Sequence, residues 1–352
     1  MRRRGYVFHR TAGVRGLAAL VVAAGVLFSR CPAAEKRERQ SKRGTASAGH
    51  ITISAGDLAV TFADNSAYGE HHRAGYNGIA ELRHKSQSET IFVPLYAGFN
   101  LEHIFGGDRL ERLFEPRQHP MTLKKLSDRS VVLHQSPTPL SSVESTITFT
   151  VVAPHYVDIH YEVVAHKKDF FKHGYLGTFW ASYINAPESK HVHFLGTEPG
   201  DDKPHWISAF SERHGFKSTH LPVGEKQDLF FAEDFNATLA SHFSDCRFSQ
   251  PFFYGRFRDM ALIFMFDRSE GIRFSQSPTG GGAKNPAWDF QFVVRSFEVG
   301  KAYSFNARLA YEPFASGRGI VREFEKLRRV FRRNVLKHVP MNNRAPNGER
   351  SP

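Results

Sequence analysis

Apolar and polar residues alternate with a period of two along much of the chain. The alternation is regular in 145–151, 157–163, 288–294 and 302–311. Successive side chains of a β-strand point to opposite faces, so these segments predict antiparallel strands with one apolar and one polar face. The residues Ala153-Pro154-His155 predict a hairpin turn between the first two. Further strands are predicted at 51–55, 57–63, 77–83, 90–94, 121–126, 130–135, 174–184, 205–211, 251–257 and 260–266.

One segment, 318–337, has the helical period instead. Its apolar residues recur at steps of three and four, and Arg and Lys fill the opposite side; the apolar set is Ile320, Phe324, Leu327, Phe331 and Val335. This pattern predicts an amphipathic helix. Such a basic helix either lies on a membrane or covers the flank of a sheet, and the second reading is favoured.

The predicted fold class is all-β: a large two-sheet antiparallel supersandwich with one C-terminal amphipathic helix. The 32 Phe among 352 residues favour a thick aromatic interior between stacked sheets. No internal repeat is present, which argues against a propeller. We therefore expect a single domain over 50–338.

The N-terminus has the order of a secretory signal peptide. A basic stretch, Met1 to Arg15, precedes the apolar stretch Gly16 to Phe28, and small residues precede Glu35. We predict a signal peptide at 1–34, a flexible leader at 35–49 and a disordered tail at 339–352. The expected location is secreted or periplasmic. A retained N-terminal anchor is the alternative; after cleavage no membrane span is expected.

Charge and cysteine content narrow the possible partners. Removal of 1–34 deletes six Arg and no acidic residue, so the net charge falls from +12 to +6. The remaining positive charge lies mainly near the two ends, which does not favour a nucleic-acid-binding face. Only Cys246 would remain, which excludes an intrachain disulfide. It is interpreted as a small half-buried side chain rather than a nucleophile.

Several segments together resemble a known superfamily. They are 76–84 (YNGIAELRH), 90–94 (TIFVP), the glycines 280–282 and 285–290 (NPAWDF). A chain of this length with these segments resembles the galactose-mutarotase-like β-supersandwich proteins, and also exported proteins of planctomycete-like bacteria. In mutarotases a histidine acid and a glutamate base open and close a sugar ring. The Asn-His motif of that family is absent here. The resemblance therefore implies the fold and a carbohydrate ligand, but assigns no catalytic residue.

The segment 96–105 is the richest in candidate chemistry. Strict alternation places Asn100 and Glu102 on one face of a strand, and Leu101 and His103 on the other. Asn100 is a candidate for binding a sugar hydroxyl, Glu102 for a general base and His103 for an acid. The alternative is an edge strand entering a turn, with Glu102 in solvent.

Other candidates are scattered along the chain. The prolines of 115–120 would present Arg117 and His119 rigidly, and Arg117 or Arg256 would bind an anionic group; a plain surface turn is the alternative. Glu144 is a second candidate base and His220 a second candidate acid. Glu144 also fits a solvent-exposed outer face of the sheet. Trp180 and Trp288 are candidates for stacking on a sugar ring, although both also fit a buried core. Asp289 is a candidate for substrate binding at the base of the glycine-rich loop.

No cofactor is expected and no metal site is assigned. The glycine-rich loop 276–286 lacks the Gly-Lys-Ser/Thr ending of a phosphate-binding loop and is interpreted as a lid. His191 and His193 would point the same way on a strand, but no third and fourth ligand is evident.

Two functions remain open. The first is an exported carbohydrate-binding or carbohydrate-active protein that carries out acid–base chemistry on a sugar, as an epimerase, lyase or hydrolase. The second is a non-catalytic envelope module that binds a glycan or a protein. The oligomeric state is not predicted.

Overall fold

The computed structural model describes residues 49–338, except 97, 108–113, 233–234 and 236–237, and the backbone alone for 332–338. The predicted signal peptide at 1–34, the tail at 339–352 and all of the predicted leader except residue 49 lie outside the described residues. The described residues belong to one compact unit.

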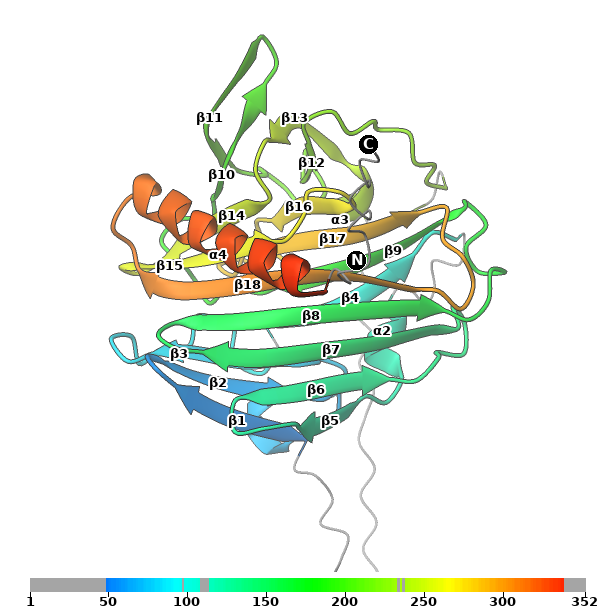
Figure 1. Ribbon diagram of the computed structural model, residues 1–352, viewed down its shortest axis with the longest axis horizontal. Helices are drawn as coiled ribbons and strands as arrows, with labels where there is room; N and C mark the ends of the chain where they lie inside the picture. Colours follow the sequence, from blue (N-terminus) through cyan, green and yellow to red (C-terminus); the bar gives the residue numbers. More distant parts are fainter. Residues whose placement is uncertain (1–48, 97, 108–113, 233–234, 236–237, 339–352) are drawn as a thin grey trace, which may run out of the picture. The chain divides into compact units, whose positions relative to one another are not determined.

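The described part of the chain is built mainly of strands (Figure 1). The strands are β1 (His50–Ala55), β2 (Leu58–Ala63), β3 (Gly78–His84), β4 (Phe99–Phe105), β5 (Thr122–Lys125), β6 (Ser130–Gln135), β7 (Val143–Val152), β8 (Tyr156–Ala165), β9 (Tyr175–Ser182), β10 (Val192–Glu198), β11 (Asp201–Ala209), β12 (Thr219–Pro222), β13 (Phe243–Phe248), β14 (Phe252–Phe257), β15 (Met260–Phe266), β16 (Ile272–Ser277), β17 (Ala287–Arg295) and β18 (Ala302–Pro313). The helices are η1 (Gly69–His71), α2 (Glu115–Gln118), α3 (Thr238–Ser241) and α4 (Gly317–His338). The prediction of a β protein with one long C-terminal helix is confirmed.

Strand pairing joins the strands into one continuous network rather than two separate sheets. The pairing order is β5, β6, β7, β8, β18, β15, β14, β10, β13, β12, β16, β17, β9, β4, β3, β2 and β1, with β11 added to the side of β10. The pairs are antiparallel except that of β12 with β13. The expectation of two distinct stacked sheets therefore needs correction, because β18 pairs with both β8 and β15 and so links regions that a sandwich would separate (Figure 1).

The period-two pattern identifies the buried face of β7 and β8, whereas β17 is buried on both faces, so the polar face predicted for 288–294 is not exposed. In β7 every second residue is buried, from Val143 to Val151, and the predicted hairpin with β8 is present, with Val152 opposite Tyr156. The apolar faces meet in a core rich in aromatic rings. Trp180, for example, stacks on Phe290 with ring centroids 5.7 Å apart. Full burial of each such side chain contributes about 1.5–3 kcal/mol.

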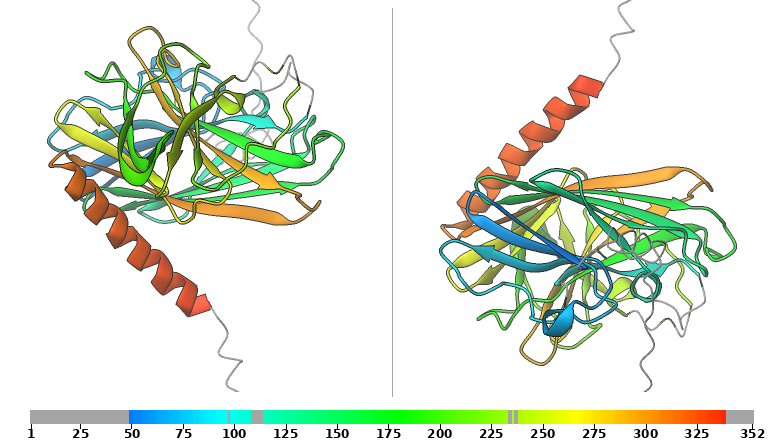
Figure 2. Two further views of the ribbon diagram at one scale, coloured as in Figure 1. Left: turned by 90° about the horizontal axis from the view of Figure 1, so that it is seen from above. Right: turned by 90° about the horizontal axis from the view of Figure 1, so that it is seen from below.

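Helix α4 covers one side of the strands with the apolar stripe that the sequence predicts. Ile320, Phe324 and Leu327 are buried, and Phe324 contacts Phe252 of β14 with ring centroids 4.8 Å apart. The favoured reading, a helix that flanks a sheet, describes these first turns. The later turns extend away from the strands (Figure 2). Among the described residues, no helix is both long enough and apolar enough to cross a bilayer.

Candidate functional site

A β-bulge in β4 turns two consecutive polar side chains to the same side of the sheet. Leu101 pairs with Trp180 of β9, but the next pairing joins His103 to Phe179, so Glu102 is an extra residue in the ladder. A bulge re-aims the side chains that follow it. Leu101 therefore packs in the core, whereas Glu102 and His103 both line a cavity on the other face. The prediction that Leu101 and His103 share one face of the strand was therefore wrong.

The cavity is lined by residues of β4, β9 and β17 and by residues of the loops and short helices beside them. Its volume is about 430 Å³, which falls within the usual range for small-molecule sites. It combines two carboxyl groups, one guanidinium, two histidines and several aromatic rings. The lining residues are Tyr76, Glu102, His103, Phe114, Arg117, Phe179, Tyr183, His214, Thr238, Leu239, Gly280, Ala287 and Asp289.

Glu102 is held by three side chains around its carboxylate. Arg117 Nη2 lies 3.0 Å from Glu102 Oε1, and the Tyr183 hydroxyl donates to the same oxygen at 2.7 Å. His103 Nε2 lies 3.7 Å from Oε2. Oε2 has no hydrogen-bond partner among the described residues, so it is the oxygen that remains available to a ligand.

Both the backbone around Arg117 and its side chain are held by hydrogen bonds. Arg117 lies in the short helix α2; the carbonyl of Pro116 in this helix and that of His119 just after it accept hydrogen bonds from the Gln135 side chain at 2.9 and 2.7 Å. Its guanidinium donates to Asn100 Oδ1 through Nε at 3.1 Å and Nη2 at 2.8 Å, and it covers the ring of Tyr76 at 4.3 Å. These contacts hold the guanidinium in place, and its carboxylate partner within the protein is Glu102.

Asp289 enters the cavity from β17. Its side chain is 1% exposed, and Oδ1 accepts a hydrogen bond from the Ser182 backbone N–H at 2.8 Å. Oδ2 is buried and has no hydrogen-bond partner among the described residues. A buried carboxyl oxygen without a donor is costly when ionised, so this group favours its protonated form.

The two cavity carboxyl groups have pKa values displaced in opposite directions. Burial raises the pKa of Asp289 well above its usual value, and the negative charge of Glu102 raises it further. Burial also opposes ionisation of Glu102, but Arg117, His103 and the Tyr183 hydroxyl together hold its pKa below the usual value. One carboxyl group of the cavity thus favours its ionised form and the other its protonated form, an arrangement typical of acid–base pairs.

Two histidines complete the polar lining. His103 packs against the ring of Phe114, with centroids 4.4 Å apart. His214 comes from the loop before β12, and its Nδ1 lies 3.0 Å from the Ser277 hydroxyl. A histidine ring can donate to or accept from hydroxyl groups through its two nitrogens.

The structure brings together part of the predicted set. Glu102, His103, Arg117 and Asp289 line the cavity, and Asn100, which is fully buried, binds Arg117 behind them. They come from three segments of the chain that β4, α2 and β17 place next to one another.

The remaining predicted residues lie elsewhere. Trp180 and Trp288 are 0% exposed in the core, so neither ring offers a face to a ligand. His220 is buried against the Phe194 ring, and burial lowers its pKa to about 4. It therefore cannot serve as a loop acid.

Glu144 belongs to a different face of the sheet. It lies between His134 and His166, whose Nε2 atoms are 2.9 and 2.7 Å from its two oxygens, and this group is partly exposed. Arg256 covers the ring of Phe314 at 4.5 Å. The His119 side chain does not line the cavity either; only its backbone carbonyl supports the Arg117 turn.

Tyr76, Tyr183 and His214 are among the lining residues that were not predicted as candidates. Tyr183 has the same sequence parity as Phe179 and the opposite parity to Trp180, which is buried in the core. This alternation was the signal that could have placed Tyr183 on the cavity side. His214 was passed over for His220, six residues later. Tyr76 lies within the segment that carries the resemblance, but nothing local marks its ring as a support for Arg117.

Among the described residues, one cluster outside the cavity has the composition of a metal site. His155, Glu312 and Glu323 place one potential ligand atom each within 4.8 Å of one another. These side chains already have protein partners, since Glu323 accepts from the Tyr156 hydroxyl at 2.6 Å and His155 Nε2 lies 2.9 Å from Glu312 Oε2. The cluster links the β7–β8 turn, β18 and α4.

The predicted lid, 276–286, begins within the last residues of β16 and contributes only Gly280 to the cavity lining. Lys190 Nζ donates to the carbonyls of Pro278 and Ala283, both at 2.7 Å, and so ties the two sides of the loop together. A side chain at Gly280 would meet Ala287 Cβ at 2.6 Å. The loop is therefore pressed onto the start of β17.

No protein-family model and no curated protein sequence matches the chain. Solved structures that match include a putative aldose 1-epimerase from Escherichia coli K12, with 10% identity, a TM-score of 0.45, and coverage of 75% of this chain and 99% of the other. A galactose mutarotase-like protein from Lactobacillus casei ATCC 334 matches with 12% identity, a TM-score of 0.40, and coverage of 75% and 100%. A heparan sulfate lyase from Pedobacter heparinus matches with 13% identity, a TM-score of 0.37, and coverage of 81% and 40%.

Proposed function

We propose that the cavity binds a sugar and moves protons on it, with Asp289 as the acid and Glu102 as the base. The observation that carries the proposal is the opposite displacement of the two carboxyl pKa values within one 430 Å³ cavity. The raised pKa of Asp289 favours a group that keeps a proton to give, and the lowered pKa of Glu102 favours a group that is ionised and able to accept one.

The reaction that suits this pair without any co-reactant is the opening and closing of an aldose ring. Asp289 gives its proton to the ring oxygen as the bond from that oxygen to the anomeric carbon breaks. Glu102 takes the proton of the anomeric hydroxyl as the carbonyl forms. Closure on the other face of the carbonyl returns both protons, so the protein ends the cycle in its starting state.

The rest of the lining suits a polyhydroxylated ring. Arg117 and His214 supply hydrogen-bond donors, while the rings of Tyr76, Phe114 and Phe179 supply apolar surface. Sugars need both, because their hydroxyl groups require partners and their C–H faces pack on aromatic rings. Arg117 also compensates the charge of Glu102, so a neutral sugar fits better here than an anionic one.

Anomer interconversion followed by proton NMR tests the proposal. We expect the full chain to accelerate interconversion of freshly dissolved aldoses, screened singly, beyond the spontaneous rate. Asp289→Asn and Glu102→Gln should each remove most of the acceleration, typically by about 100-fold or more. Glu144→Gln is the matched control, because this carboxylate lies outside the cavity, and it should keep the activity. Binding of a sugar without any acceleration would favour a non-catalytic binding module instead.

We also infer export. The inference rests on the basic stretch before Gly16, the apolar stretch to Phe28 and the small residues Ala33 and Ala34. N-terminal sequencing of the protein recovered from its own cells tests it. A mature chain that begins near Glu35 supports export, and recovery of an intact N-terminus in the cytosol contradicts it.

A further inference from the structure

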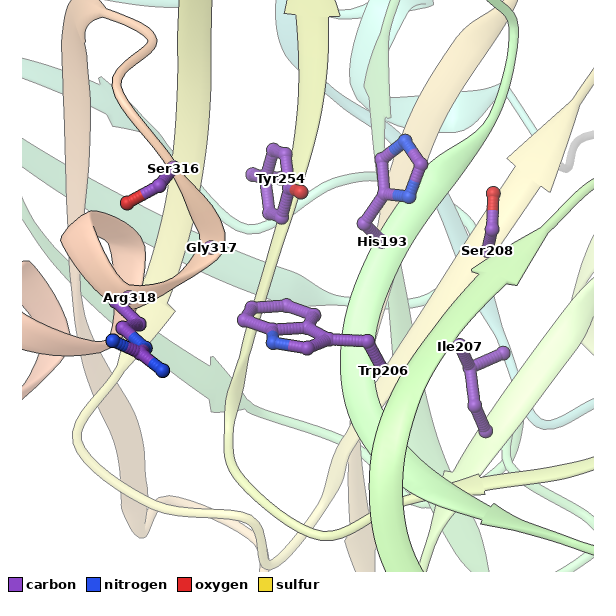
Figure 3. Close-up of a pocket in the computed structure, with 8 residues that line it drawn as sticks. All are labelled: His193, Trp206, Ile207, Ser208, Tyr254, Ser316, Gly317 and Arg318. Atoms are coloured by element: carbon purple, nitrogen blue, oxygen red, sulfur yellow. The ribbon is translucent and has the colours of Figure 1, made fainter.

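A second and larger cavity lies between the β10–β11 hairpin, β14 and the beginning of α4 (Figure 3). Its volume is about 610 Å³. None of its lining residues also lines the cavity of Glu102 and Asp289. It is therefore a separate site, and the proposed acid–base function does not use it.

One side of this cavity is formed by residues that strand pairing places next to one another. Ser208 of β11 pairs with His193 of β10, and His193 pairs in turn with Tyr254 of β14, so the three side chains form a row across the sheet. Trp206 lies two residues before Ser208 on the same face of β11. Figure 3 shows the indole of Trp206 beside this row, facing the first residues of α4.

Trp206 is held in place yet remains accessible. Its ring meets Tyr254 edge-on, with centroids 5.7 Å apart, and a Cβ at Gly317 would lie only 3.1 Å from its indole nitrogen. The side chain is nevertheless 38% exposed, whereas the other two tryptophans are fully buried. A positioned and partly exposed indole is the kind of surface on which the C–H face of a sugar packs.

Three polar groups around the indole have no hydrogen-bond partner within the described part of the chain. Tyr254 is 6% exposed, yet its hydroxyl has no hydrogen-bond partner among the described residues. The hydroxyl oxygen is not fully buried, and Tyr254 lines the cavity. The Trp206 indole N–H and the Ser208 hydroxyl likewise have no partner within the described chain. Three groups of this kind can bind sugar hydroxyls.

The surroundings are positively charged. Arg318 lines the cavity, and Arg256 lies on the same face of β14 as Tyr254; within the described chain neither guanidinium has a carboxylate partner. Burial, together with His191 and Arg256, lowers the pKa of His193 to about 4, so this ring is neutral and its neighbourhood repels a further positive charge. The amide N–H groups at the start of α4 also favour an anion.

We propose that this cavity binds a uronate unit of a saccharide, with its ring packed on Trp206 and its carboxylate bound by Arg318 at the N-terminus of α4. The buried, unpartnered Tyr254 hydroxyl would bind a ring hydroxyl. A carboxylate fits better than a bulkier or neutral group because the planar guanidinium can bind it through two parallel hydrogen bonds.

Titration of the full chain with an α-1,4-linked tetramer of galacturonic acid tests the proposal. Tryptophan fluorescence is the readout, since Trp206 is the exposed tryptophan and the other two lie in the core. We expect a saturable change with the acidic tetramer and none with its fully methyl-esterified form, which keeps the sugar rings and loses the charges. Equal binding of both forms would overturn the role of the carboxylate and with it the proposal.

Variants locate the binding, measured by calorimetry. Trp206→Ala and Arg318→Ala should each weaken binding of the acidic tetramer by about tenfold or more. Gly317→Ala should weaken it too, because the added methyl group presses on the indole. Gly319→Ala is the matched control, since its Cβ would meet nothing closer than 3.8 Å. No response of wild type at millimolar tetramer, or unchanged affinity in Trp206→Ala with native circular dichroism, would overturn the proposal.

Discussion

Leu101 and His103 are two residues apart in β4, yet they point to opposite faces of the sheet. A regular strand would place them on the same face. The extra residue between them, Glu102, shifts the register and so brings an acid and a histidine into one cavity beside Arg117. The bulge is thus what assembles the site from a strand that otherwise serves the core.

The Arg117–Glu102 ion pair should contribute most to the free energy of unfolding at neutral and alkaline pH. Arg117→Met leaves Glu102 buried without its cation, and such losses cost about 3–5 kcal/mol. The pKa of Glu102 should then rise, because burial is no longer opposed by the guanidinium. The loss in the free energy of unfolding should therefore be smaller at pH 5 than at pH 8, as measured by urea denaturation.

Adding Glu102→Gln to Arg117→Met provides the control for this prediction. The double variant should recover part of the stability at pH 8, since no unpaired charge remains. Equal losses at both pH values, or no recovery in the double variant, would show that the ion pair is not the source of the effect.

The contribution of Asp289 to the free energy of unfolding should decrease as the pH rises. Its pKa is raised in the folded state, so it binds a proton more tightly there than in the unfolded chain, whose Asp pKa is about 3.9. Its stabilising contribution is complete below the unfolded pKa and is lost as the pH rises through the folded pKa, at about 1.4 kcal/mol for each unit between them.

Asp289→Asn removes this dependence while retaining an oxygen for the Ser182 N–H. Its gain in the free energy of unfolding over wild type should be larger at pH 8 than at pH 5. Asp128→Asn serves as the control because that carboxylate is almost fully exposed, and it should show no such gain. A gain of the same size at both pH values would contradict the elevated pKa of Asp289.

Trp180 should matter for stability and not for ligand contact. Its ring is enclosed by Phe99, Tyr161 and Phe290 at centroid distances of 5.2, 4.9 and 5.7 Å. Trp180→Ala should lower the free energy of unfolding by about 3–5 kcal/mol. Trp206→Ala, at a partly exposed ring, should cost much less. Similar costs for the two variants would contradict the assignment of Trp180 to the core.

Much of the fold follows from local patterning. The alternation in 145–151, 157–163 and 302–311 predicts strands that are present, and the step of three and four predicts α4 to within one residue at each end. Both periods are properties of the backbone and need no knowledge of distant residues. The closure of the strands into one network depends on which edges meet, and the alternation does not encode that.

The candidate site was only partly predictable for the same reason. Glu102, Arg117 and Asp289 were selected because their residue types suit the chemistry, but their convergence depends on the bulge in β4 and on the pairing of β9 with both β4 and β17. Trp180 and Trp288 were selected by type as well, and their alternation places them in the core. Residue type identifies what a side chain can do, and long-range pairing decides which neighbours it has.

The pKa values of the two cavity carboxyl groups provide the most direct test. Carbon-13 NMR of labelled aspartate and glutamate side chains would follow both titrations, with Asp289→Asn and Glu102→Gln assigning the resonances. We expect Asp289 to remain protonated well above the usual range of aspartate and Glu102 to remain ionised below that of glutamate. Titration of Asp289 near 3.9, the value of an unperturbed aspartate, would contradict its role as the proton donor.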